Sequence, residues 1–218
     1  MPTETAMPDA MLDILKRAPV VPVLVIENAD DAVPLARALV AGGLPALEVT
    51  LRTPAALDSI RRITAEVPEA LVGVGTIMKP ADFDTAQEAG ARFAVSPGAT
   101  DALLEAARAS GMPFLPGVAT ASEVMRGMEA GLSVFKAFPA AAIGGPATVA
   151  AFGGPFPEAR FCPTGGIRSG TAADYLRLPN VVAIGGTWLA PKEKVRAGDW
   201  QGIEDLARSA AGLAEHLG

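Results

Sequence analysis

The amino-acid sequence predicts an α/β protein, a (β/α)8 barrel with one helix ahead of its first strand. Eight apolar runs recur with centres roughly 20 to 26 residues apart, the span of one strand, one helix and two loops. Patterns with helix start and stop signals separate these runs. Polar side chains occur late in several of the runs, as expected for a barrel whose site lies at the carboxyl ends of its strands.

The expected strands are the eight apolar runs themselves. They cover residues 20–26, 46–51, 71–77, 93–98, 114–119, 134–139, 160–166 and 181–188. Their nearly continuous apolar character is typical of parallel strands that are covered on both faces. An open, doubly wound sheet would use similar units. We favour the barrel because eight units can close into a ring and because the polar positions collect at one end.

The helices are expected from the signals at their ends. The first is predicted at about residues 8–17. Thr53, followed by Pro54, is typical of a helix start, and Thr120 with Glu123 has the spacing of a capping box. Glycines are expected to end three of the helices, at Gly90, Gly111 and Gly131. With no linker-like stretch, the sequence predicts a single domain over 1–218, in which 1–19 form the N-terminal segment and helix.

The composition excludes several classes of function. Half of the residues are hydrophobic and 19% are charged, with a net charge of −6, so nucleic acid and anionic membranes are not expected partners. Cys162 is the only cysteine and His216 the only histidine, which rules out an intrachain disulfide and a zinc cluster. No secretory leader and no membrane-spanning run is apparent. We expect a cytoplasmic protein without a metal.

Lys136 is the residue that points most directly to chemistry. It lies in the otherwise apolar run 134–139, where an unpaired ammonium is costly. One interpretation is a structural ion pair with Glu48 inside the barrel. The other is a nucleophilic amine that burial keeps uncharged, ready to attack a carbonyl.

Glu48 belongs to a strand whose alternation places it on one face with Thr50 and Arg52. That face is predicted to point into the barrel mouth. Glu48 either pairs with Arg52 or moves protons beside Lys136. Arg52 is either an ordinary rim residue or a bidentate anchor for a substrate carboxylate.

Two glycine pairs end the last two expected strands. Gly165 and Gly166 follow strand seven, and Gly185 and Gly186 close strand eight. Barrels frequently bind phosphate in the loops after these two strands, and glycine allows the close approach and positive φ angles that an anion site needs. We therefore expect a phosphorylated small molecule as the substrate.

Six short motifs occur in order along the chain and carry a resemblance. They are "LEVTLR" (47–52), "GVGT" (73–76), "SPG" (96–98), "FKAFPA" (135–140), "CPTGGI" (162–167) and "IGGTW" (184–188). With them the chain, from about residue 10 to 215, closely resembles the bacterial 2-keto-3-deoxy-6-phosphogluconate aldolase family, which also includes 4-hydroxy-2-oxoglutarate aldolase activity. The resemblance implies a class I aldolase: a metal-independent barrel lyase, a homotrimer, that needs no cofactor beyond a Schiff base on its own lysine.

The resemblance also implies roles for individual residues. Lys136 matches the lysine that forms the Schiff base, and Glu48 matches the general acid and base. The residues expected to hold the carboxylate of the pyruvyl portion are Arg52 and Thr76, with Pro97 and Phe138 lining that pocket. The residues expected at the phosphate end are Thr164, Gly165, Gly166, Gly186 and Thr187.

Two departures from the family pattern concern the substrate rather than the chemistry. Thr187 stands where members of the family have serine, and Ala141, Ala142 and Ile143 replace a commonly polar stretch. Two other classes remain open: a barrel isomerase or synthase that uses the same phosphate site without an imine, and a binding protein for phosphorylated acids.

Overall fold

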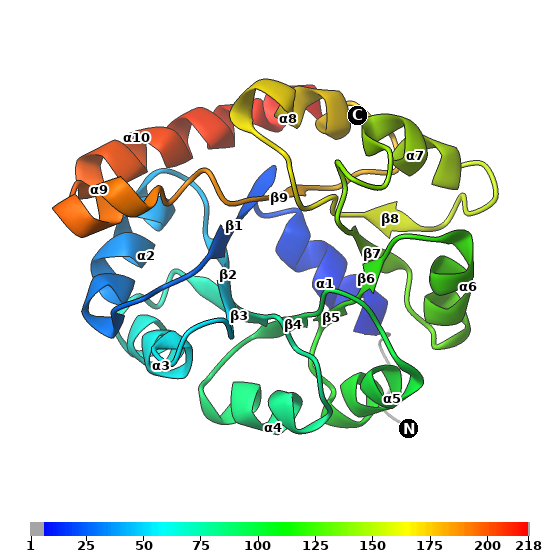
Figure 1. Cartoon of the computed structure of the whole chain (residues 1–218), viewed down its shortest axis with the longest axis horizontal. Helices are drawn as coiled ribbons and strands as arrows, with labels where there is room; N and C mark the ends of the chain where they lie inside the picture. Colours follow the sequence, from blue (N-terminus) through cyan, green and yellow to red (C-terminus); the bar gives the residue numbers. More distant parts are fainter. Residues whose placement is uncertain (1–6, 218) are drawn as a thin grey trace.

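A computed structural model describes residues 7–217, and it confirms the predicted barrel of parallel strands inside a ring of helices (Figure 1). The strands are β1 (Val20–Leu24), β2 (Ala46–Thr50), β3 (Leu71–Gly75), β4 (Phe93–Val95), β5 (Phe114–Leu115), β6 (Gly117–Val118), β7 (Val134–Ala137), β8 (Arg160–Phe161) and β9 (Ile184–Gly186). Each lies within an expected run but is shorter, because the last residues of the runs leave the hydrogen-bonded ladder.

The strands close into a ring. One sheet has the order β5-β4-β3-β2-β1-β9 and the other the order β6-β7-β8. The strand predicted at 114–119 is divided at Pro116, which has no N–H to donate to a ladder. A parallel bridge between Thr164 and Gly185 joins the segment after β8 to β9. Counting β5 and β6 as one strand, eight positions complete the barrel, so the doubly wound alternative is wrong.

The helices follow their strands on the outside of the ring. They are α2 (Ala32–Ala41), α3 (Ala56–Glu66), α4 (Ala81–Glu88), α5 (Asp101–Ser110), α6 (Ala121–Glu129), α7 (Gly145–Phe152), α8 (Ser169–Leu176), α9 (Lys192–Ala197) and α10 (Trp200–Ala211), with 3-10 turns at Ala29–Asp31 and Gly212–His216. No helix within residues 7–217 has the length and apolar character needed to cross a membrane.

The predicted helix ends were right in part. The Thr120–Glu123 capping box is present, and Gly111 ends α5 with a φ of 68°. The predicted start at Thr53 and Pro54 is wrong, because α3 begins at Ala56. The Thr53 hydroxyl instead donates to the carbonyl of Ile26, 2.5 Å away, and so ties the loop after β2 to the loop after β1.

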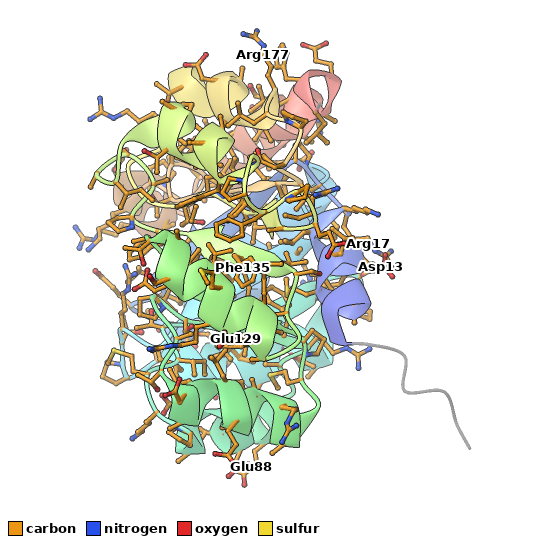
Figure 2. All side chains as sticks on the ribbon, turned by 90° about the vertical axis from the view of Figure 1, so that its right-hand side faces the viewer. Asp13, Arg17, Glu88, Glu129, Phe135 and Arg177 are labelled. Atoms are coloured by element: carbon orange, nitrogen blue, oxygen red, sulfur yellow. The ribbon has the colours of Figure 1, made fainter. Side chains whose placement is uncertain are left out.

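The N-terminal helix α1 (Met7–Leu15) closes one end of the barrel. Its Met11 and Leu15 are 1% exposed and pack with Phe93 and other side chains from the interior of the strands. Figure 2 shows α1 lying across this end, with Asp13 and Arg17 on its outer side. Because α1 leads directly into β1, the closed end is the amino-terminal one. The carboxyl ends of the strands are left for a site.

Cys162 belongs to the same interior cluster and is 1% exposed. Burial raises the pKa of its thiol to about 12, an effect that the charge of Lys136 opposes and that of Glu48 reinforces. The prediction of a small core residue is therefore confirmed. Since the pKa is raised, the neutral thiol is the form that the folded state favours.

We expect Cys162 of the folded protein to resist iodoacetamide at pH 8, because only the exposed thiolate reacts. Intact mass should show an unmodified chain, while the same treatment in guanidinium chloride should add a single group. The unfolding free energy should also fall as the pH rises from about 9 to about 12, because between these two pKa values the unfolded chain ionises the thiol while the folded state keeps it protonated. Equal labelling of the folded and unfolded chains would contradict this account.

Candidate active site

Glu48 and Lys136 meet inside the barrel. Glu48 lies on β2 and Lys136 on β7, which are on opposite sides of the ring. The Lys136 Nζ donates to Glu48 Oε1 at 3.1 Å and to Oε2 at 3.3 Å. The two side chains are only 5% and 3% exposed. The predicted contact between an amine and a carboxylate in one enclosed space is therefore present, and a proton can pass directly between the two groups.

Glycines on two strands near this pair allow close approaches, Gly75 to the Glu48 side chain and Gly117 to the loop after β4. A Cβ at Gly75 would lie 2.3 Å from Glu48 Oε1, so no larger residue fits on β3 beside the carboxylate. Gly117 is the register partner of Lys136, and a Cβ there would lie 2.1 Å from the carbonyl oxygen of Pro97. Sequence reasoning missed both residues. The signal that could have found them is a glycine inside an otherwise apolar strand.

Phe138 lies beside the amine at the mouth of the barrel. The Lys136 Nζ is 5.4 Å from the centroid of the Phe138 ring, a distance at which the ring face attracts a cation. Phe138 and Glu48 thus both contact the same amine. Glu48 lies within reach to accept a proton from the amine when a substrate carbonyl arrives.

Arg52 and Thr76 form a second contact above the pair. Arg52 was expected on the same extended face as Glu48, but β2 ends at Thr50, whose hydroxyl donates to the Leu24 carbonyl at 2.9 Å. Arg52 lies in the following turn, exposed, and its Nε donates to Thr76 Oγ1 at 3.3 Å. The guanidinium keeps other N–H groups free for an anion. Within residues 7–217, Thr76 is the one non-glycine residue with a positive φ, at 66°.

Substitutions at Thr76 can separate the cost of its left-handed backbone from the role of its hydroxyl. A β-branched residue in this conformation costs about 1–2 kcal/mol, and glycine removes that cost. We expect Thr76→Gly to unfold at a higher denaturant concentration than Thr76→Ala. Both variants lack the hydroxyl that contacts Arg52, and the role that the family resemblance implies for Thr76 predicts a raised KM for the oxo acid in both. Chemical denaturation measures the stability and steady-state kinetics measure the KM. A Thr76→Ala protein more stable than Thr76→Gly would contradict the claim that this backbone conformation is strained.

The glycine loop after β8 has the geometry expected of an anion site. Gly165 and Gly166 have φ angles of 98° and 75°. The loop pairs with the turn after β7, where Ala141 N–H donates to the Gly165 carbonyl at 3.0 Å. A Cβ at Gly166 would lie 2.6 Å from that of Ala141. The backbone N–H groups of Gly165, Gly166 and Ile167 donate to no other residue in the described chain, so they can bind an anion.

The second glycine pair differs from the expectation. Gly185 and Gly186 are not among the positive-φ residues, so the idea that they supply such angles is wrong. They are required by close approach instead. A Cβ at Gly185 would lie 2.3 Å from Thr164 Oγ1, and one at Gly186 would lie 2.4 Å from the Trp188 ring. Thr187 follows them and is exposed, at the same end of the barrel as the first glycine loop.

The fold and this arrangement define the class of protein: a barrel in which a buried lysine lies against a buried carboxylate, as an enzyme that works through a Schiff base requires. The comparisons with known proteins agree. The family model "KDPG and KHG aldolase" matches residues 11–206. The chain belongs to the KDPG and KHG aldolase family and is therefore an aldolase, a lyase.

Relatives and solved structures support this placement over most of the chain. The chain is 53% identical over 197 residues to the KHG/KDPG aldolase of Escherichia coli (strain K12), covering 90% of this chain and 92% of that protein. The KDPG aldolase of Legionella pneumophila, solved with pyruvate as a covalent carbinolamine intermediate, has a TM-score of 0.90 at 45% identity, over 92% and 98% of the two chains. The enzyme of Zymomonas mobilis ZM4 with 3-phosphoglycerate also has a TM-score of 0.90, at 48% identity over 95% and 97%.

Proposed function

We propose that this protein is a class I aldolase that cleaves 2-dehydro-3-deoxy-6-phosphogluconate into pyruvate and glyceraldehyde 3-phosphate. The observation that carries the proposal is the buried pair of Lys136 and Glu48, with Nζ and Oε1 3.1 Å apart. The covalent pyruvate adduct in the Legionella pneumophila relative and the names of the curated relatives support it.

The reaction begins at Lys136. Its neutral amine adds to the C2 ketone of the substrate, and the resulting carbinolamine loses water to give an iminium ion. Glu48 takes one proton from the Lys136 nitrogen and gives it to the ketone oxygen as the amine adds. It then takes a second proton from the nitrogen and gives it to the hydroxyl, which leaves as water. The iminium then accepts the electron pair of the C3–C4 bond.

Glu48 drives the cleavage step as a general base. It removes the proton of the C4 hydroxyl, directly or through one water, as C3–C4 breaks and glyceraldehyde 3-phosphate leaves. The enamine that remains on Lys136 is protonated at C3. Water then adds to C2 and releases pyruvate, which returns the amine to its starting state.

Contacts away from the reacting bond hold the two ends of the substrate. In this proposal Arg52 and Thr76 bind the carboxylate, and Pro97 and Phe138 line the pyruvyl pocket. The phosphate is bound by Thr164, Gly165, Gly166, Gly186 and Thr187. Binding energy from the phosphate orients the substrate so that C2 lies against Nζ. The 3-phosphoglycerate in the Zymomonas mobilis structure supports a phosphate end of this kind in the family.

A second substrate of the same chemistry is 4-hydroxy-2-oxoglutarate, which would give pyruvate and glyoxylate. The family description and the name of the Escherichia coli relative favour it. The first steps at Lys136 would be identical, since both substrates are 2-oxo acids with a hydroxyl on C4. The galactonate epimer of the first substrate is the remaining candidate within this class.

We also propose that the enzyme requires no metal, works as a homotrimer and acts in the cytoplasm as one barrel domain. Among residues 7–217, no three histidine, cysteine or carboxylate side chains come together to hold an ion. The net charge of −6 argues against nucleic acid as a partner. The homotrimer rests on the resemblance to the family.

The proposed function is tested by pyruvate release. Purified protein with EDTA and 2-dehydro-3-deoxy-6-phosphogluconate should consume NADH in an assay coupled to lactate dehydrogenase. Turnover of 4-hydroxy-2-oxoglutarate and of the galactonate epimer in the same assay ranks the substrates. A protein that isomerises or condenses sugar phosphates but releases no pyruvate from any of the three would favour the barrel isomerase or synthase instead.

A further inference from the structure

We propose that Arg168 is a substrate-binding residue that contacts the phosphate, so that this chain supplements the backbone amides of its glycine loop with a guanidinium. The assignment rests on the proposed function, because it concerns the phosphate end of the same site. It would make Arg168 the residue that separates phosphorylated from unphosphorylated substrates.

The backbone places Arg168 at the right point. It follows Gly166 by two residues and is the N-cap of α8, with φ −123° and ψ 163°. Its N–H donates to Thr171 Oγ1 at 3.1 Å, and its carbonyl accepts from the Thr171 N–H at 3.0 Å. Arg168 is therefore held between the glycine loop and the first turn of α8, where the unpaired N–H groups and the helix dipole also favour an anion.

The guanidinium is free to bind a ligand. Arg168 is exposed, and its side chain forms no ion pair or hydrogen bond with the residues that the structure describes. By contrast, Lys192 at the start of α9 is paired with Glu27 at 2.7 Å, and Arg196 contacts the same carboxylate at 3.3 Å. An arginine offers two parallel donors to a phosphate, a geometry that a lone backbone N–H does not provide.

Arg168 is also the one cation in its part of the barrel. Between residues 138 and 191 the chain carries three basic residues: Arg160, Arg168 and Arg177. Arg160 begins β8 at the closed end, and its Nη1 donates to the carbonyls of Pro157 and Ala159. Arg177 follows the C-terminal end of α8, the opposite end of that helix. Figure 1 shows the chain leaving the barrel interior to reach the start of α8, which lies in the outer ring of helices.

The turn opposite the glycine loop offers no polar side chain to a phosphate. Ala141, Ala142 and Ile143 offer no polar side chain, although Ala141 packs directly against Gly166. The protein as a whole is acidic, with a net charge of −6, and a phosphorylated oxo acid carries about three negative charges at neutral pH. A single arginine at this rim offsets the repulsion between the acidic protein and the substrate. Because the arginine is exposed, its interaction with the phosphate should weaken as the salt concentration rises.

The experiment compares Arg168→Gln, Arg168→Lys and a control, Arg177→Gln, on the same helix. The readouts are steady-state cleavage of 2-dehydro-3-deoxy-6-phosphogluconate, inhibition by 3-phosphoglycerate, and exchange of the pyruvate methyl protons with deuterated water. The exchange reports imine and enamine formation without a phosphate. Thermal melts check that each variant is folded.

We expect Arg168→Gln to lower kcat/KM for the phosphorylated substrate about tenfold, mainly through KM, and to weaken inhibition by 3-phosphoglycerate similarly. Pyruvate exchange should stay within about twofold of the parent, Arg168→Lys should fall between the two, and Arg177→Gln should match the parent. Unchanged KM and inhibition in Arg168→Gln would overturn the assignment, and so would an equal loss in pyruvate exchange. A parent protein without exchange would overturn the proposed function itself.

Discussion

Lys136→Arg is expected to lose at least about 10⁴-fold in kcat/KM for aldol cleavage, because a guanidinium cannot form an imine at neutral pH. Arginine keeps a positive charge opposite Glu48, so the variant preserves the ion pair while removing the nucleophile. Lys136→Met, which removes both, should be equally inactive. The coupled pyruvate assay measures both losses, and circular dichroism shows whether each variant remains folded.

The comparison separates the two interpretations of the buried lysine. If Lys136 served only as a structural partner for Glu48, Lys136→Arg would keep substantial turnover while Lys136→Met lost it. Lys16→Met is the matched control, since Lys16 is exposed just after α1 at the closed end of the barrel. It should retain the activity of the parent. Turnover by Lys136→Arg within tenfold of the parent would contradict the nucleophile.

Glu48→Gln is expected to lower kcat by about 10²–10⁴-fold, the usual contribution of a general acid and base. The amide can still accept a hydrogen bond from Lys136, so the side chain should stay in place beside Gly75. The glutamine amide cannot take the proton of the substrate hydroxyl. Rapid-mixing and steady-state kinetics should place the loss in the chemical steps, with KM changed much less.

Stability gives a second readout for the same substitution. Removing one charge from a buried pair leaves the other without compensation, so Glu48→Gln should have a lower midpoint of unfolding than the parent. Glu66→Gln is a suitable control, because Glu66 is exposed and lies 3.9 Å from Arg37. A Glu48→Gln protein that turns over at the parent rate would show that another group moves the proton.

Much of the fold could be predicted because the apolar runs and the helix ends agree with one another. Each predicted strand is present, and the capping box at Thr120 begins α6 as its spacing indicates. The helix start predicted at Thr53 is wrong because of a tertiary contact. Thr53 looked like an N-cap, yet its hydroxyl binds the Ile26 carbonyl, and a hydrogen bond between loops outweighs a local preference.

The chemistry of the site and the meeting of its amine and carboxylate could be predicted from the sequence, while the finer geometry could not. A lysine among apolar residues is rare enough to mark Lys136, but its contact with Glu48 depends on β2 and β7 facing each other across a closed ring. The positive φ of Thr76 could not be inferred, since threonine disfavours that conformation. The space cleared by Gly75 depends on the register of β3 against β2.

The measurement that tests the central claim most directly is borohydride reduction of the protein in the presence of pyruvate, followed by intact mass and peptide mapping. The account predicts one reduced pyruvyl group per chain, carried by Lys136, and no adduct in Lys136→Met. It should form with EDTA present, because the chemistry resides in the amine. A folded protein that gains no adduct, or gains it on another lysine, would contradict the assignment of Lys136 as the nucleophile.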